Sequence, residues 1–246
     1  MIISGTQLVG GTYGTSPIVQ TGLTQWWDAQ SYTTGGTWPA KTGNIATFVN
    51  SPAYTSSSPT YFNFNPSSLQ FAMSDNIGDL NSWTIESWFR PQADLSADGN
   101  DGLKAILTTV YDDELSGHTG QINYCFTNYN GSGGALNAIS VGFFNGNWHL
   151  TSPVSVTTGT WYYMSGTYDG STMSQYYNGS LNSSTGATGP STANNGKILI
   201  GRRWDGNINP IYLFPGDIAV IRIYNTALNS TQISQNFNAE RGRFGV

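Results

Sequence analysis

The chain has 246 residues, a formal net charge of −5 and only 9% charged residues, whereas an ordinary soluble domain carries about 25%. Nine Lys and Arg against fourteen Asp and Glu exclude the basic surface of a nucleic-acid-binding protein. No apolar run approaches the roughly 20 residues of a membrane span. Hydrophobic residues make up 38% of the chain, and eight residues are tryptophans, so the chain can bury a core and is not expected to be disordered.

The first twenty residues, Met1–Gln20, contain no charged residue and precede the first convincing strand. We predict that they form an extended N-terminal arm and that residues 21–246 form a single domain. The apolar side chains of the arm are expected to dock against a neighbouring subunit, so the chain is expected to form a homo-oligomer. Residues Met1–Gly5 lack the charged region and apolar run of a secretory signal, which predicts synthesis in the cytoplasm without a signal peptide.

Short apolar or alternating runs between Gly, Asn and Ser clusters predict strands along most of the chain. The dipeptides Asp169-Gly170 and Asn178-Gly179 are typical of tight β-hairpins. The expected fold is therefore all-β, a jelly-roll sandwich of two antiparallel sheets. The predicted strands are Thr24–Trp27, Ile45–Val49, Ser68–Met73, Thr84–Arg90, Ala105–Val110, Gln121–Asn128, Ala138–Phe144, Trp161–Tyr168, Ser174–Asn178, Lys197–Gly201 and Asp217–Tyr224.

One short helix is expected near the C-terminus, over Ser230–Phe237. Asn229 can cap this helix, and Gln232 stands three residues later, which is the spacing of a capping box. In the last predicted strand, strict alternation would place Ala219 on the same face as Ile221. The expected core residues are Trp26, Ile85, Trp83, Trp88, Phe89, Trp161, Ile198, Ile200, Ile221 and Ile223.

Five segments in order along the chain resemble the strand motifs of laminin G-like domains of the concanavalin A-like lectin/glucanase superfamily. Trp83–Pro91 is similar to the family's core strand with a central Thr-Ile-Glu, and Gly159–Gly170 is similar to its Gly-Thr-Tyr-Asp-Gly segment. The resemblance implies a concanavalin A-like jelly roll, but these motifs are structural and imply no particular function. The other matching segments are Gly22–Ala29, Ile200–Arg202 and Gly216–Leu228.

The final segment, Asn236–Val246, resembles the ending of laminin G-like proteins encoded by tailed phages, notably marine and cyanobacterial ones. This resemblance implies a virion structural protein: a head decoration, neck or tail appendage. Its expected partners are other virion proteins, further copies of itself and host cell-surface polysaccharide. The alternative is a stand-alone carbohydrate-binding or adhesion module of a bacterium.

Glycosidases share this fold, but the chain lacks their carboxylates, so no enzyme is expected. A retaining glycosidase needs two carboxyl groups about 5–5.5 Å apart, and the glucanase branch of the family supplies them from Glu-x-Asp-x-x-Glu on one strand. The three glutamates, Glu86, Glu114 and Glu240, do not fit that pattern. Asp112 and Glu114 are the nearest imitation, and their stretch has the composition of a loop.

Two loops combine a tryptophan with amide or carboxylate side chains, as sugar-binding sites do. Trp204 stands beside Asp205 and Asn207 in the long loop between two predicted strands. Trp148 follows a second Asn-rich loop. These four residues are candidate glycan-binding residues, and for Trp148 the alternative is that it begins a strand of the sandwich.

Calcium is the one metal that the resemblance suggests, because some laminin G-like domains bind it. It needs six to eight oxygen ligands. Asp98, Asn100 and Asp101 form the densest group of oxygen-bearing side chains and could converge on Ca²⁺ with backbone carbonyls. The alternative is a solvated hairpin loop. Asp75 and Asp79 are a second candidate pair, and no other cofactor is expected.

Overall fold

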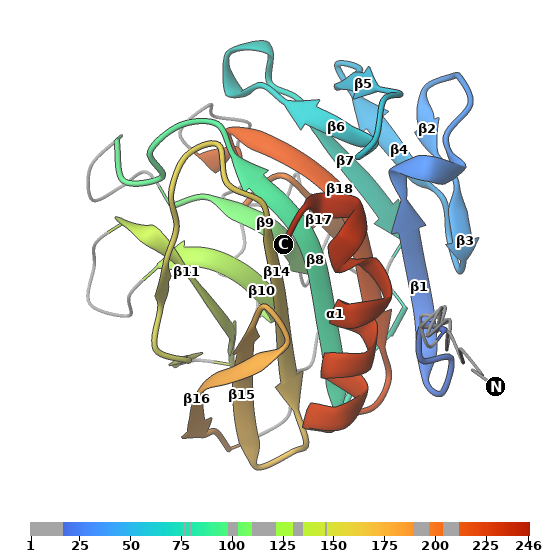
Figure 1. Ribbon diagram of the computed structural model, residues 1–246. Coiled ribbons are helices and arrows are strands. Elements are labelled where there is room, and N and C mark those ends of the chain that lie inside the picture. The colour runs from blue at the N-terminus through green and yellow to red at the C-terminus, as the bar shows by residue number, and fades with distance from the viewer. Residues whose placement is uncertain are drawn as a thin grey trace, which may run out of the picture.

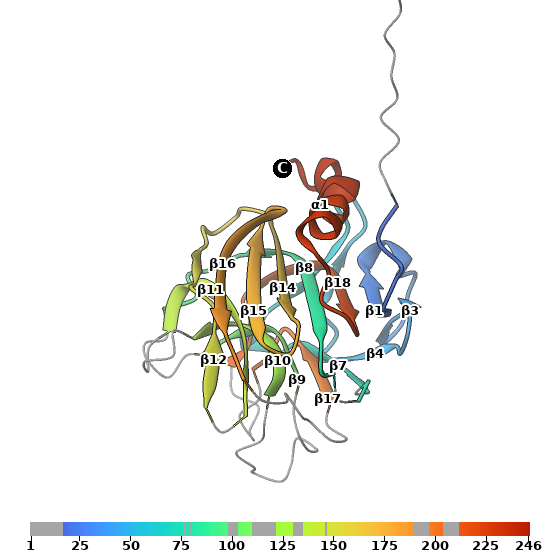
Figure 2. The same ribbon diagram turned by 90° about the horizontal axis from the view of Figure 1, so that it is seen from below.

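The structure is a computed structural model. It describes residues 17–75, 77–78, 80–97, 103–109, 122–129, 135–145, 147–188, 197–203 and 212–246. Two antiparallel β-sheets pack face to face, and one helix, α1, lies across the outside of the first sheet (Figure 1). Seen from below in Figure 2, α1 and the second sheet lie on opposite sides of the molecule. The predicted all-β jelly-roll sandwich of two antiparallel sheets with a C-terminal helix is thus confirmed.

Sheet A has the strand order β16-β15-β14-β8-β18-β1-β3, and β6 and β5 extend it beside the first residues of β18. Its central strand β18 is buried along its whole length, because the second sheet covers one face and α1 covers the other. The strands are β1 (Leu23–Asp28), β3 (Ala40–Thr42), β5 (Ala53–Thr55), β6 (Tyr61–Phe64), β8 (Trp83–Pro91), β14 (Tyr162–Tyr168), β15 (Thr172–Tyr177), β16 (Ser180–Gly186) and β18 (Gly216–Tyr224).

Sheet B has the order β12-β11-β10-β9-β17-β7-β4-β2, and β13 also pairs with β11. One face of this sheet packs on sheet A, and no helix of the described residues covers the other face (Figure 2). The strands are β2 (Thr37–Trp38), β4 (Ala46–Val49), β7 (Phe71–Asp75), β9 (Ala105–Thr109), β10 (Ile122–Tyr129), β11 (Ala135–Phe144), β12 (Trp148–Leu150), β13 (Val154–Ser155) and β17 (Lys197–Ile200).

The main core lies between the sheets and contains most of the predicted core residues. Trp161 is buried as predicted, but it belongs to a second apolar cluster on the outer face of sheet A. Ala219 also belongs to this outer cluster, so its predicted facing was wrong: the strand register shifts between Ile218 and Val220, which breaks the alternation. Trp26 is only half-buried. The confirmed residues of the main core are Trp83, Ile85, Phe89, Ile198, Ile200, Ile221 and Ile223.

Local turn chemistry explains where several elements begin and end. The predicted Asn-Gly hairpin joins β15 to β16, with φ of 45° at Asn178 and 77° at Gly179, which is the backbone that this dipeptide accepts. Strand β7 begins at Phe71 and not at Ser68 as predicted, because Pro66 opens a short 3₁₀ turn, η2 (Pro66–Ser68). A second 3₁₀ turn, η1 (Ala29–Ser31), follows β1.

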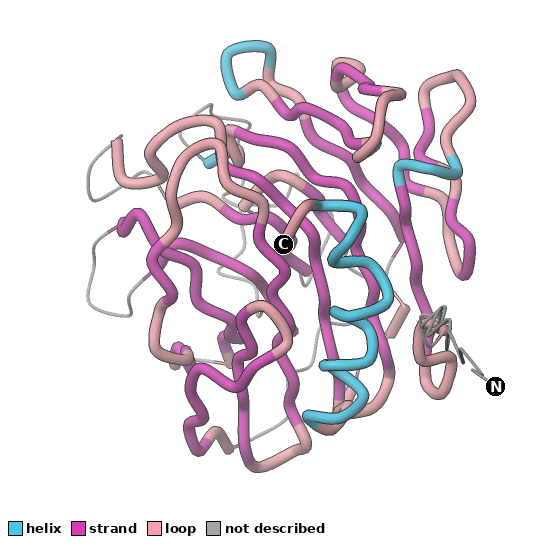
Figure 3. The backbone as a smooth tube through the Cα atoms, viewed as in Figure 1, coloured by secondary structure: helices cyan, strands magenta, loops and turns pink. Residues whose placement is uncertain are grey.

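Helix α1 (Figure 3) spans the 15 residues Ser230–Phe244 and therefore ends seven residues later than the predicted Ser230–Phe237. The predicted capping box is confirmed. The side chain of Asn229 accepts a hydrogen bond from the Gln232 N–H, and the side chain of Gln232 accepts one from the Asn229 N–H. The helix continues to Phe244 because this residue packs beneath it on sheet A with Phe237. No helix in the described part of the chain is long and apolar enough to cross a membrane.

Residues 17–20, the last of the predicted arm, lie along α1. Val19 is buried in the outer cluster of sheet A, and its N–H donates to the side chain of Asn236 at 2.8 Å. Gln235 donates to the carbonyl of Pro17 at 2.5 Å. Residues 1–16 lie outside the described residues, so the extended arm remains a prediction.

Candidate functional site

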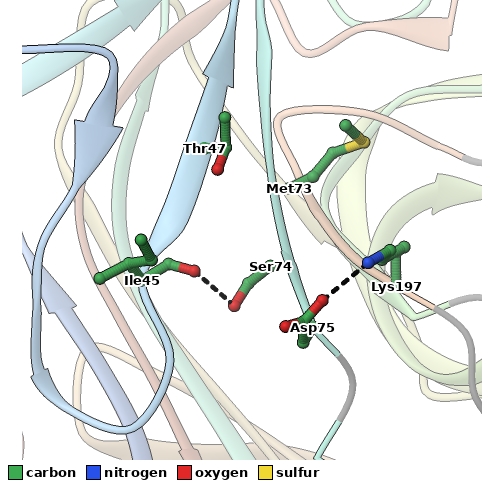
Figure 4. Close-up of a pocket in the computed structure, with 6 residues that line it drawn as sticks. All are labelled: Ile45, Thr47, Met73, Ser74, Asp75 and Lys197. Carbon is green, nitrogen blue, oxygen red and sulfur yellow. Dashed lines mark hydrogen bonds and ion pairs between the residues drawn. The ribbon is translucent and has the colours of Figure 1, made fainter.

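Three neighbouring strands of sheet B form an open hollow on the face that points away from sheet A. The hollow has a volume of about 330 Å³, which lies at the lower end of the roughly 300–1,000 Å³ that small-molecule sites occupy. It lies over β4, β7 and the start of β17 (Figure 4). Six of the described residues line it: Ile45, Thr47, Met73, Ser74, Asp75 and Lys197.

Strand alternation brings these side chains to one face. In β7, Ala72 belongs to the core between the sheets, so Met73 points outward and Asp75 follows it on the same side. Thr47 of β4 is the direct cross-strand neighbour of Met73, and Lys197 of β17 is that of Asp75. The hollow therefore depends on the pairing of strands that are far apart in the sequence.

The floor of the hollow is aliphatic. Met73 is half-buried and packs at the edge of a small apolar cluster on this outer face, formed by Phe71, Leu199 and Leu213. Ile45 is 57% exposed and is one of two large apolar side chains that are exposed among the described residues. The floor thus offers apolar contact area that is open to solvent.

The exposed polar side chains of the hollow are those of Asp75, Lys197 and Thr47, whereas Ser74 is buried. The Lys197 Nζ donates to Asp75 Oδ1 at 2.7 Å, and the two side chains are 42% and 75% exposed, respectively. The hydroxyl of Ser74 donates to the Ile45 carbonyl at 2.9 Å, which fixes the loop before β4. Thr47 is exposed. The site therefore combines an aliphatic surface with an acceptor, an ammonium donor and a hydroxyl, which suits a ligand with both C–H and O–H groups.

The described residues of the hollow include a single carboxylate. This carboxylate is that of Asp75, whereas glycoside hydrolysis uses a pair of carboxyl groups. The exposed Asp75–Lys197 pair can exchange hydrogen bonds with a hydroxylated ligand at little cost, because a surface ion pair contributes only about 0–1 kcal/mol.

Two of the three glutamates, Glu86 and Glu240, belong to a network beneath α1. The Nη1 atom of Arg222 lies 3.2 Å from the Glu86 carboxylate, and its Nη2 atom binds the Glu240 carboxylate. Glu86 also accepts from the Tyr163 hydroxyl at 2.7 Å and from the Asn236 amide at 2.8 Å. Burial raises the pKa of Glu86 in spite of the nearby Arg222. Because the Glu86 side chain is 0% exposed, this network anchors α1 and is closed to a substrate.

The carboxylate of Asp217 is also occupied by neighbouring side chains. It accepts from Arg90 Nε at 2.7 Å, from Gln92 at 2.6 Å and from Asn63 at 2.7 Å. The Arg90 guanidinium lies 5.0 Å from the ring centre of Trp161. These contacts join β6, β8 and β18 on the outer face of sheet A.

Asp28, at the end of β1, connects to the last turn of α1. It lies 2.9 Å from Arg243 and 2.8 Å from Lys41. Burial alone would raise the pKa of Asp28, but Arg243, Lys41 and the N–H of Gln30 hold it below its usual value. Asp28 is thus ionised and structural.

Of the glycan-binding residues predicted from sequence, only Trp148 lies among the described residues. It begins β12 at the edge of sheet B, and its ring is half-buried beside Phe144, with ring centres 5.4 Å apart. Of the two interpretations of Trp148, a glycan-binding residue or the start of a strand, the structure shows the start of a strand. Trp148 does not line the hollow. Trp204, Asp205 and Asn207 lie outside the described residues.

The predicted calcium ligands Asp98, Asn100 and Asp101 also lie outside the described residues, so that site remains a prediction. Asp75, from the second candidate pair, is bound to Lys197, and its predicted partner Asp79 is not described. Among the residues that the structure does describe, no group of three or more His, Cys, Asp or Glu could hold a metal ion.

The hollow itself was missed from the sequence, apart from Asp75. The outward positions of Met73 and Asp75 could have been found from strand alternation in β7. The contributions of Ile45 and Lys197 could not, because 152 positions separate these two residues (197 minus 45) and strand pairing brings them together.

Comparison with known proteins identifies the family to which the fold belongs. Residues 65–234 match the family model described as the concanavalin A-like lectin/glucanases superfamily. A search of curated proteins found no match.

Several solved structures share the architecture at low sequence identity. Domain 4 of AbnA, a GH43 extracellular arabinanase from Geobacillus stearothermophilus in complex with arabinotriose, is 17% identical, with a TM-score of 0.60 over 87% of this chain and 97% of that domain. Trypanosoma rangeli sialidase is 17% identical, with a TM-score of 0.59 over 90% of this chain and 33% of the sialidase. At such identities the likeness shows the fold alone.

Proposed function

Because the chain belongs to the concanavalin A-like lectin/glucanase superfamily, we propose that it is a non-enzymatic protein that binds carbohydrate in the hollow of sheet B. The observation that carries this proposal is the composition of the hollow. An exposed aliphatic floor of Ile45 and Met73 lies beside the hydroxyl of Thr47 and the Asp75–Lys197 pair. A sugar ring presents the same two kinds of surface, a C–H face and a rim of hydroxyls.

The similar structures support a sugar ligand. One of them is an arabinanase domain that holds arabinotriose, and the chain aligns with nearly all of that domain. Its fold is therefore one on which carbohydrate recognition is built, although the residues that perform it differ between relatives.

The positions of four described carboxylates, which are paired with cations away from the hollow, support binding without hydrolysis. In the described part of the chain, the glutamates Glu86 and Glu240 bind Arg222 beneath α1, and Asp28 and Asp217 are held by neighbouring cations. None of these four carboxylates lines the hollow, so its described residues offer Asp75 alone and not the pair that glycoside hydrolysis uses.

The proposal predicts that the full chain is retained on polysaccharide and releases no sugar from it. Affinity electrophoresis in gels containing neutral or acidic polysaccharides, together with a reducing-sugar assay on the same polymers, measures both properties. Asp75→Ala should weaken retention, and Asp94→Ala, which removes an exposed carboxylate outside the hollow, should not. Release of reducing sugar would contradict the non-enzymatic assignment, and absence of retention on every polymer would contradict carbohydrate binding.

We also propose that the protein is a structural component of a phage virion, as a head decoration, neck or tail appendage that contacts host polysaccharide and other copies of itself. The support is the resemblance of Asn236–Val246 to phage-encoded laminin G-like proteins. Within this segment Asn236, Glu240 and Phe244 anchor α1 to sheet A, so the resemblance covers residues with a structural role. The alternative is a stand-alone bacterial carbohydrate-binding or adhesion module.

Mass spectrometry of purified particles from the source culture separates these two locations. A virion protein should be recovered at an abundance comparable to that of the capsid or tail proteins. Recovery only from a cell-envelope fraction, with none in the particles, would instead support the bacterial module.

A further inference from the structure

The charges around the hollow determine which glycans it can accept. Of the six described residues that line it, Asp75 and Lys197 are the charged ones, and their opposite charges lie 2.7 Å apart. Asp75 is the more exposed of the two, at 75% against 42% for Lys197. A ligand that approaches the rim therefore meets a carboxylate first, and Asp75 already compensates the charge of the Lys197 ammonium, which keeps N–H groups free to donate to a hydroxyl.

The other described cations have contacts of their own outside the hollow. Lys41 pairs with Asp28, Lys104 donates to the Leu95 carbonyl, Arg203 lies over the Tyr212 ring and Arg241 donates to the Val246 carbonyl. Arg90, Arg222 and Arg243 each form an ion pair with a carboxylate elsewhere in the fold. Arg202, which follows β17, is 1% exposed and lies over the ring of Phe71. The chain as a whole carries a formal charge of −5, so its field repels anions at low ionic strength.

From this charge pattern we infer that the hollow selects neutral glycans and rejects glycans that carry carboxylate or sulfate groups. The inference rests on the proposed function and adds its ligand class. A neutral sugar can donate a hydroxyl to Asp75 and accept from Lys197, while its C–H face covers Met73 and Ile45. An anionic sugar at the same place would set a second negative charge against Asp75, and like charges placed together in an interface are strongly disfavoured.

The test compares pairs of oligosaccharides with the same chain length and different charge, by titration calorimetry on the full chain. The pairs are galactotriose with trigalacturonate, cellotriose with its triuronate, and lactose with sialyllactose. At low salt the neutral member of the pair that binds should have a Kd lower by roughly tenfold or more. At 1 M salt, where the screening length is about 3 Å, the difference should shrink while neutral binding stays constant.

A matched variant locates the source of the discrimination. Asp75→Asn removes the charge and keeps the size of the side chain, so it should bring the Kd values of the two members closer together by strengthening acidic binding. Asp94→Asn, an exposed carboxylate outside the hollow, should leave the ratio unchanged. Acidic oligosaccharides that bind the wild-type chain as tightly as neutral ones would overturn this inference and leave the proposed function intact. Failure of every probe to bind would overturn the proposed function itself.

Discussion

Replacing Arg222 with methionine should lower the free energy of unfolding by about 3–5 kcal/mol, the usual loss when one partner of a buried ion pair is removed. The Arg222 side chain is 0% exposed and is bound to both Glu86 and Glu240. Methionine fills part of the space, but it leaves Glu86 without a cation in a fully buried position. Urea unfolding followed by far-ultraviolet circular dichroism measures the loss.

The loss should depend on pH. Burial raises the pKa of Glu86, and removal of the Arg222 charge should raise it further. A carboxyl with a raised folded-state pKa does not lower the free energy of unfolding at a pH where it is protonated in both the folded and the unfolded chain. It lowers that free energy most at a pH where the carboxyl is ionised in the unfolded chain. The destabilisation by Arg222→Met should therefore be smaller at about pH 4 than at about pH 8.

Two further variants identify the ion pair as the cause. Adding Glu86→Gln and Glu240→Gln to Arg222→Met removes the unpaired charges, so the triple variant should regain most of the lost stability. Lys41→Met, which breaks a partly exposed pair with Asp28, should cost no more than about 1 kcal/mol. An equal loss for Arg222→Met and Lys41→Met would mean that the buried network does not hold α1.

Trp88→Ala should also cost about 3–5 kcal/mol, as large-to-small replacements of buried aromatic residues do. The Trp88 ring is 0% exposed and stacks on Phe244 at a centroid distance of 4.1 Å and an interplanar angle of 12°. Its other neighbours under the helix are Phe237 and Tyr163, and its Nε1 donates to Glu240 at 2.9 Å. The cavity would therefore open between α1 and sheet A.

Hydrogen exchange should show where the Trp88→Ala variant is weakened. Backbone amides of α1 should lose more protection than those of β17, which lies in the other sheet. Trp88→Phe keeps a ring in the stack and should lose less stability than Trp88→Ala. Uniform loss of protection across both sheets would contradict a local role for this residue in holding the helix.

The strands of the core were predictable because their patterns are local. In β18, Ile221 and Ile223 alternate with Arg222, and the capping box of Asn229 marks the start of α1. The end of the helix was not predictable. Ile233, Phe237 and Phe244 lie on one face, but the buried positions between them include the polar Asn236. Their polar partners, Glu86 among them, are far away in the sequence.

The candidate site was less accessible to sequence reasoning than the fold. Local composition drew attention to loops with Trp204 and Asp98, which lie outside the described residues. The hollow is formed instead by side chains of ordinary strands, and it exists because β4, β7 and β17 lie side by side. A single sequence does not encode that order in any short motif, so Ile45 and Lys197 carried no visible signal.

Binding at the hollow is tested most directly by the methyl groups of the methionines, of which the chain has four. Met73 lines the hollow, whereas Met164 and Met173 are 0% exposed between the sheets. In protein labelled with ¹³C at the methionine methyls, titration with a neutral oligosaccharide should shift the Met73 signal, assigned with Met73→Leu, and leave those of Met164 and Met173 in place. Saturable binding with an unmoved Met73 signal would show that the ligand sits elsewhere and would contradict the account.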